Sequence, residues 1–156
     1  MSGVVGSAGS KSGAIGETEI DYEEGTWTPA ITTPGTIGTL TYTWQTGTYV
    51  KTGRHVQCIG FIQLGGSGIT GNSGAFTLTG LPFTCYHGGS GFMNGGGIVF
   101  WHNAFADSAP QVLRLVENTA TALGYRYATD SAIDSADISK FQNNGQFGFT
   151  LHYEAI

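Results

Sequence analysis

The chain has 156 residues, 26 of them glycine, with 11% charged residues and a formal net charge of −5 at pH 7. This length suits one domain with a real core plus a tail, and many glycines with little charge favour a β-rich protein with many turns. Six scattered basic residues exclude nucleic acid as a partner, and no apolar run is long enough to be a membrane helix.

Residues 1–20 are rich in glycine and serine, with four small apolar residues spaced between them: Val4, Val5, Ala14 and Ile15. Alone, such a segment is a flexible linker, but apolar residues on a glycine-rich chain can also lie extended on another surface. We expect an attachment arm that becomes ordered against a partner or a sister subunit; the alternative is a disordered tail. A single lysine and no apolar core argue against a signal peptide.

Residues 21–29 mark the start of the folded body. A solvated acidic collar precedes Gly25 and contains five acids: Glu17, Glu19, Asp21, Glu23 and Glu24. We expect a turn at Gly25, an anchoring role for Trp27 in the first strand, and an edge position for Pro29. The predicted organisation is therefore an arm over residues 1–20 and a body over residues 21–156.

The next two strands show a two-residue period. Leu40, Tyr42 and Trp44 alternate with polar residues and predict a half-buried strand, followed by turns at Gly47 and Gly53. The strand over residues 55–64 is apolar on both faces, with Val56, Cys58, Ile62 and Leu64 on one and Ile59 and Phe61 on the other. This pattern indicates a central strand whose outer face is covered by a partner subunit, which predicts a homotrimer.

The second half of the chain continues with short strands. Phe76 and Leu78 alternate with threonines, so the preceding G-x-G-x-x-G match at residues 66–71 opens no helix and is not a phosphate loop. We expect a buried strand over residues 98–101, a two-sided apolar strand over 112–116 and its partner over 123–127. Residues 130–144 predict a short helical turn with Asp130 or Ser131 as cap.

The last strand alternates cleanly: Phe147, Phe149, Leu151 and Tyr153 are predicted to face inward. About eight antiparallel strands with frequent turn signals and no long amphipathic helix predict an all-β fold. We expect a jelly-roll-like β-sandwich preceded by an extended N-terminal arm.

Four stretches resemble one known family. Residues 22–29, Tyr-Glu-Glu-Gly-Thr-Trp-Thr-Pro, resemble the opening of a domain that recurs at the ends of bacteriophage tail fibres and related virion proteins. Residues 45–56 resemble its Q-x-G-x-Y-x-K-x-G-x-x-V hairpin, residues 80–83 its Gly-Leu-Pro-Phe turn, and residues 137–153 its last strand. The resemblance covers residues 21–156 and implies a trimeric β-sandwich at a fibre tip.

The sequence predicts no enzyme, no cofactor and no metal site. It has no H-E-x-x-H, G-x-S-x-G or Cys-x-x-Cys motif, its four histidines fall on separate segments, and acids outside the collar sit in polar turns. Paired carboxylates for glycoside hydrolysis are the enzymatic alternative. Cys58 and Cys85 are expected to be reduced and structural, in keeping with synthesis in a host cytoplasm.

A binding role needs only displayed loops with aromatic platforms and hydrogen-bonding groups. The candidate ligand-binding residues are Tyr86, His87, Asn94, Trp101, His102 and Asn103, although Trp101 ends an apolar strand and could equally be core. The first hypothesis is a virion-displayed fibre tip that contacts other virion proteins, its sister subunits and a host glycan. The second is a capsid decoration (cement) protein, which a chain starting at Met1 without a fibre shaft would fit. The third is a secreted sugar-binding module or hydrolase.

Overall fold

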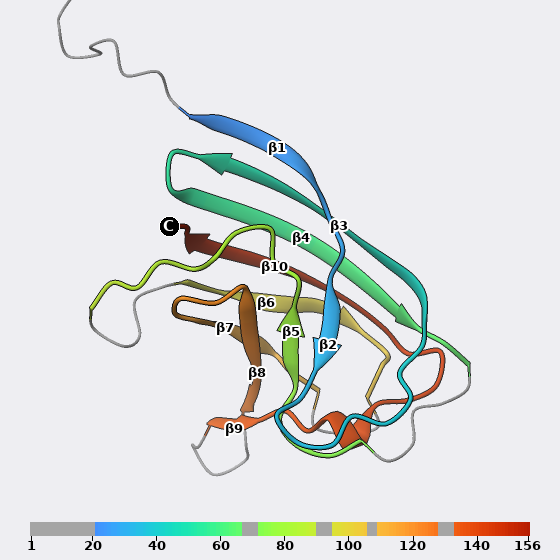
Figure 1. Cartoon of the computed structure of the whole chain (residues 1–156). Coiled ribbons are helices and arrows are strands. Elements are labelled where there is room, and N and C mark those ends of the chain that lie inside the picture. The colour runs from blue at the N-terminus through green and yellow to red at the C-terminus, as the bar shows by residue number, and fades with distance from the viewer. Residues whose placement is uncertain (1–20, 67–71, 90–94, 106–108, 128–132) are drawn as a thin grey trace, which may run out of the picture.

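The computed structural model describes residues 21–66, 72–89, 95–105, 109–127 and 133–156, and this part of the chain is almost entirely β-structure (Figure 1). Its strands are β1 (Tyr22–Trp27), β2 (Ala30–Thr32), β3 (Tyr42–Thr52), β4 (His55–Leu64), β5 (Thr77–Thr79), β6 (Gly95–His102), β7 (Val112–Val116), β8 (Thr121–Tyr127), β9 (Ile133–Ser135) and β10 (Gln146–Glu154). The predicted all-β fold is confirmed. The structure has ten strands where the sequence predicted about eight. Three of them, β2, β5 and β9, are only three residues long and are therefore hard to detect in the sequence.

All ten strands belong to one antiparallel sheet in the order β1-β3-β4-β10-β6-β7-β8-β5-β2, with β9 beside β8. The sheet curls over on itself, so that β2, β5 and β8 run steeply across the layer formed by β3, β4, β10 and β6 (Figure 1). This arrangement is a half-barrel resembling a sandwich. It gives the β3-β4-β10-β6 layer a concave face that holds the core and a convex face that we call the outer face.

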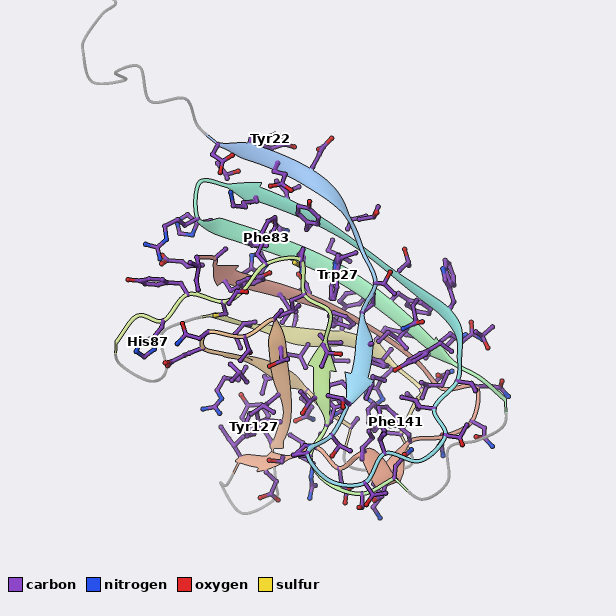
Figure 2. The ribbon with its side chains drawn as sticks, in the orientation of Figure 1. Tyr22, Trp27, Phe83, His87, Tyr127 and Phe141 are labelled. Atoms are coloured by element: carbon purple, nitrogen blue, oxygen red, sulfur yellow. The ribbon has the colours of Figure 1, made fainter. Side chains whose placement is uncertain are left out.

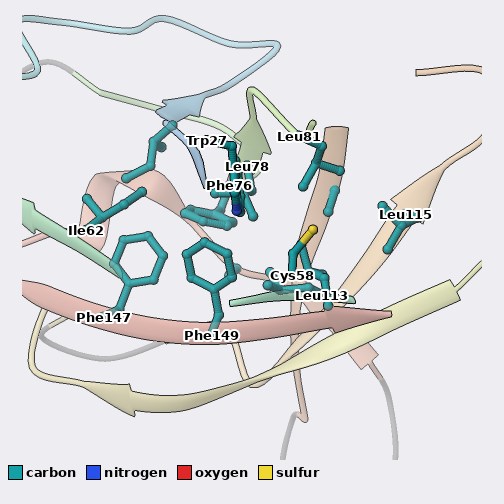
Figure 3. Close-up of a cluster of buried hydrophobic side chains, with 14 of the residues drawn as sticks. Trp27, Cys58, Ile62, Phe76, Leu78, Leu81, Leu113, Leu115, Phe147 and Phe149 are labelled. Atoms are coloured by element: carbon teal, nitrogen blue, oxygen red, sulfur yellow. The ribbon is translucent and has the colours of Figure 1, made fainter. Parts of the chain in front are cut away.

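The core fills the concave face. Phe147, Phe149, Leu151 and Tyr153 of β10 are all buried, as their alternation predicts, and the first three are fully buried. Figure 3 shows Phe147 and Phe149 pointing from β10 into the core. Trp27 packs edge-on against Phe149 with 6.0 Å between ring centroids, so it anchors β1 as expected. The β4 side chains predicted to face inward are buried as well: Val56, Cys58, Ile62 and Leu64.

A tyrosine hydroxyl binds the backbone of the edge strand β2. The Ile31 amide donates a 2.8 Å hydrogen bond to Tyr42 Oη, although β2 and β3 are not neighbours in the sheet. The Gln45 side-chain amide donates to the carbonyl of Pro29 at 2.6 Å. Pro29 is fully buried between β1 and β2 and lies at the edge, as expected. These two bonds give partners to buried backbone groups at and beside the edge strand β2.

Gly25 and Gly47 are not turns, contrary to the sequence prediction. Both lie inside strands, paired with Tyr49 and Trp27 respectively. A Cβ atom at Gly25 would lie 2.8 Å from the Tyr49 ring, and one at Gly47 would lie 2.3 Å from Trp27 Nε1. These glycines are therefore needed for close approach of aromatic rings. The turn predicted at Gly53 is present, with φ of 59°.

The sequence predicted that Trp44 and the strand over residues 98–101 would be buried, and this prediction is wrong. A register irregularity between Tyr42 and Trp44 breaks the two-residue period, so Tyr42 faces inward and Trp44 is 56% exposed. A second register irregularity occurs in the β10-β6 pairing, between Gly148 and Phe149. It leaves Phe100 and Trp101 on the outer face, where they are 58% and 55% exposed. A bulge adds one residue to one strand and shifts the later side chains to the opposite face.

The helical turn predicted within residues 130–144 is a short 3-10 helix, Ile138–Lys140, capped by Asp137. The Asp137 carboxylate accepts a 2.8 Å hydrogen bond from the Ser139 amide. Asp130 and Ser131, the predicted caps, lie outside the described residues, as do the whole predicted arm over residues 1–20 and Asn94.

Candidate functional site

The structure separates the residues that the sequence grouped as a binding site. The Tyr86 amide donates to the carbonyl of Glu154 at the end of β10, whereas the Asn103 side chain accepts from the amide of Gln146 at its start. A strand of this length spans about 26 Å, so the two groups lie at opposite ends of the layer. The described members of the predicted set therefore do not form one site.

Tyr86 and His87 make contacts that brace the end of the sheet. The Arg54 guanidinium lies 3.7 Å from the centre of the Tyr86 ring, and its Nε donates to the carbonyl of Ala155. His87 Nδ1 pairs with the Glu117 carboxylate (His87 is labelled in Figure 2). These contacts join the segment after β5 to the β3-β4 turn, the β7-β8 turn and the C-terminal residues.

At the other end of the layer, Asn103 uses its side chain to hold the β10 backbone, and His102 packs edge-on against Phe105 with 6.3 Å between ring centroids. Trp101 belongs instead to a group of large apolar side chains on the outer face, which we call the apolar patch: Trp44, Ile59, Phe61, Ile98, Phe100 and Trp101. Its members other than half-buried Phe61 are 49% to 58% exposed.

The apolar patch is continuous across four strands. Ile59 lies opposite Thr150, which lies opposite Ile98, and in the next row Phe61, Gly148 and Trp101 follow one another. The Trp44 and Phe61 rings are 5.3 Å apart. A Cβ atom on Gly148 would lie 2.8 Å from the Phe100 ring, so that ring covers the glycine. The sequence signalled Ile59 and Phe61 but not the rest, because the bulges could not be foreseen.

The other end of the outer face is hollowed and carries several polar side chains. One groove of about 360 Å³ crosses β3, β4 and β10, lined by Val50, Thr52, His55, Val56, Gln57, His152, Tyr153 and Glu154, with Gly95 of β6 at its far end. A second groove of about 370 Å³ crosses β1 and β3, lined by Glu24, Gly25, Thr26, Thr48, Tyr49 and Val50. The two grooves are neighbours that share Val50 in their linings, and we call them together the polar trough.

Tyr22 stands beside this trough. Its ring is 59% exposed, and Tyr22 pairs with Thr52 on β3 (Figure 2). The Tyr22 hydroxyl donates a 2.7 Å hydrogen bond to Glu24, and this bond raises the pKa of Tyr22. The bond holds the ring along β1, so the acidic collar is partly built into a strand.

The two carboxylates that line the trough are far apart. Glu24 and Glu154 lie three strands apart, which is about 14 Å at the usual strand spacing, and paired glycosidase carboxylates lie within about 10 Å. Within the described ranges, no group of three or more His, Cys, Asp and Glu side chains could hold a metal ion. The free thiol of Cys58 is buried, and burial raises its pKa to about 12.

The fold and this surface define an all-β domain with one covered and one uncovered sheet face. No protein-family model matches the chain, and no curated protein matches it. Among solved structures, the crystal structure of the Dettilon tailspike protein (gp208) has a similar fold, with a TM-score of 0.65 and 16% sequence identity. The likeness covers 86% of this chain and 24% of the tailspike chain, so this chain matches about a quarter of that protein's length.

The described part of the chain contains no helix with the length and apolar character needed to cross a lipid bilayer.

Proposed function

We propose that this chain is a non-enzymatic structural domain of a bacteriophage virion: a homotrimeric, surface-displayed fibre tip or knob, anchored by residues 1–20 and contacting the host surface. The observation that carries this proposal is the apolar patch, since a protein displayed alone would expose it to water. The fold shared with a tailspike supports the virion setting and favours the tail over the capsid decoration alternative.

The size of the apolar patch fits a subunit interface. Its six side chains, half exposed on average, present about 500 Å² of apolar surface. A standard interface covers about 800 Å² per partner, of which about 60% is apolar, so the patch has the area of an interface centre. A patch of this area matches the largest apolar patch of a typical monomeric protein, and such patches are often functional.

Charge supports a sister copy as the occupant of the patch. The chain carries a net charge of −5, so copies repel each other at most orientations. The six residues of the apolar patch are uncharged, and Thr150 and Gly148 between them are uncharged as well. Copies that meet through this patch bury apolar surface without bringing like charges together.

The proposed lack of catalysis follows from the spacing of the outer-face acids. Acid–base chemistry needs two groups with separated pKa values inside one pocket, and Glu24 and Glu154 lie at different ends of an open trough. A surface of this kind is suited to contact with a ligand but not to holding a bond in a reacting geometry.

The experiment that tests the virion role is electron microscopy of intact particles that contain the protein with a small label fused after Ile156. Label at the tail supports a fibre tip, and label distributed over the head would support the cement alternative instead. Particles without label at either place would contradict both. The same particles without the fused label provide the control.

A further inference from the structure

We propose that the polar trough binds a neutral oligosaccharide; this inference rests on the proposed display of the protein towards a host surface. The trough crosses β1, β3, β4, β10 and β6, and four strand spacings amount to about 19 Å. It is therefore long enough for a short linear chain that lies across the strands.

The lining of the trough matches sugar hydroxyl groups. Gln57 offers an amide with both donors and an acceptor, Thr48 and Thr52 offer hydroxyls, and His55 and His152 offer ring nitrogens. Sugar hydroxyls both donate and accept, so they can pair with all of these groups. A peptide can instead add to a free strand edge, and β1 is an edge strand, so a peptide is the competing occupant that the test includes.

Charge selects neutral sugars over acidic ones. No lysine or arginine lines either groove, while Glu24 and Glu154 supply carboxylates near opposite ends. A uronic acid, sialic acid or phosphate would therefore face like charge with no cation to pair with, and like-charge juxtaposition opposes binding. The lining therefore excludes acidic polysaccharides as preferred ligands.

Tyr22 supplies the stacking surface that sugar binding commonly uses. Its ring is 59% exposed at the β1 end of the trough and is held by the bond to Glu24. Aromatic rings combine an apolar face with a polar tip, which suits the apolar face of a sugar ring beside its hydroxyls.

The trough and the apolar patch occupy different ends of the same face. The two surfaces adjoin at one row, in which Thr48 lines the trough and Ile59 and Ile98 belong to the patch. An interface between sister copies centred one row further on, at Phe61 and Trp101, leaves the trough at its rim. Each site is shallow, and we expect weak binding per site that becomes useful through display of several copies.

The test uses the full chain and saturation-transfer NMR with hexasaccharides of glucose, mannose, galactose and N-acetylglucosamine, alongside hyaluronan and polysialic acid fragments. At least one neutral member should bind, and the acidic members should bind more weakly. Gln57→Ala and His152→Ala should each lower its affinity about fivefold or more. Gln63→Ala, the same change on the outer face of the same strand but outside the trough, should leave affinity unchanged.

Three results would overturn the proposal: no neutral saccharide binds at millimolar concentration, acidic saccharides bind more tightly, or affinity is unchanged in Gln57→Ala and His152→Ala. A peptide that competes for the trough in preference to sugars would overturn it too. Sedimentation of each variant reports the oligomeric state separately. A monomer that binds neutral sugar through Gln57 would refute the proposed trimer and leave the trough site standing.

Discussion

Gly47 lies beneath the indole of Trp27, and the absence of a side chain there lets β1 pack closely on the sheet. A Cβ atom at this position would lie 2.3 Å from Trp27 Nε1, which is far inside van der Waals contact. The sequence suggested a turn for this glycine because glycine is common in turns. The reason for a glycine inside the strand at position 47 becomes clear only from the Trp27 ring that covers it.

We expect Gly47→Ala to lower the free energy of unfolding by about 1–3 kcal/mol, because the buried indole must move to admit the methyl group. Urea unfolding followed by Trp fluorescence measures the change. Thr46→Ala, an exposed neighbour on β3, is the matched control and should change stability by less than about 0.5 kcal/mol. Equal stability of Gly47→Ala and the parent would contradict the described packing.

Because the thiol of Cys58 is buried, we expect the free energy of unfolding to fall at alkaline pH. Burial raises its folded-state pKa from 9.0 to about 12, so its contribution to stability is complete below pH 9 and is lost as the pH rises towards 12. In that window the unfolded chain releases a proton that the folded chain retains. The free energy of unfolding should fall by about 1.4 kcal/mol per pH unit from this group.

Comparison with Cys58→Ala checks this expectation, since the variant should lose less stability between pH 9 and pH 11 than the parent. Burial also raises the pKa of Tyr153, which interacts with Cys58, so the difference between the two slopes reports this coupled pair. Identical slopes in the two proteins would show that Cys58 is not desolvated in the folded state.

At the scale of strands, alternation predicted the faces of β4 and β10 correctly because both run without interruption through the middle of the layer. It failed at Trp44 and Trp101, where an extra residue shifts the side chains by one position. A bulge leaves no clear mark in local composition, and one shifted residue reverses the face of everything after it. The fold class could therefore be predicted, whereas most of the apolar patch could not.

The hydroxyl of Tyr42 joins β2 to the beginning of β3, two elements that are distant in the sheet order. We expect Tyr42→Phe to destabilise the protein by about 1–2 kcal/mol, because it leaves the Ile31 amide without its acceptor. Hydrogen exchange should accelerate most at Ile31. Tyr127→Phe, at an exposed tyrosine of β8, is the control, and equal exchange in both variants would exclude the proposed role of Tyr42.

At the scale of the whole molecule, the described residues of the predicted binding set lie at opposite ends of β10, so they do not line one site. The polar trough was missed for a related reason. Its residues come from β1, β3, β4 and β10, and only the register of these strands places them side by side. No local signal in the sequence identifies such a surface.

The arm over residues 1–20 is expected to attach the protein to the virion or to sister subunits without contributing to the fold of the body. Deletion of these residues should leave thermal unfolding of the body nearly unchanged, because the described core is formed entirely from residue 27 onward. The same deletion should abolish incorporation into particles. Normal incorporation of the truncated protein would disprove the attachment role.

Sedimentation equilibrium of the full chain at micromolar concentration shows directly whether copies of the same chain cover the apolar patch. We predict a mass three times the 16.3 kDa of one chain. Ile98→Asp, which places a charge in the patch, should shift the protein to monomer. Ile133→Asp, the same change at an exposed isoleucine of β9, should leave the trimer intact. A stable monomer for the parent chain, or an intact trimer for Ile98→Asp, would show that copies of the same chain do not cover the patch.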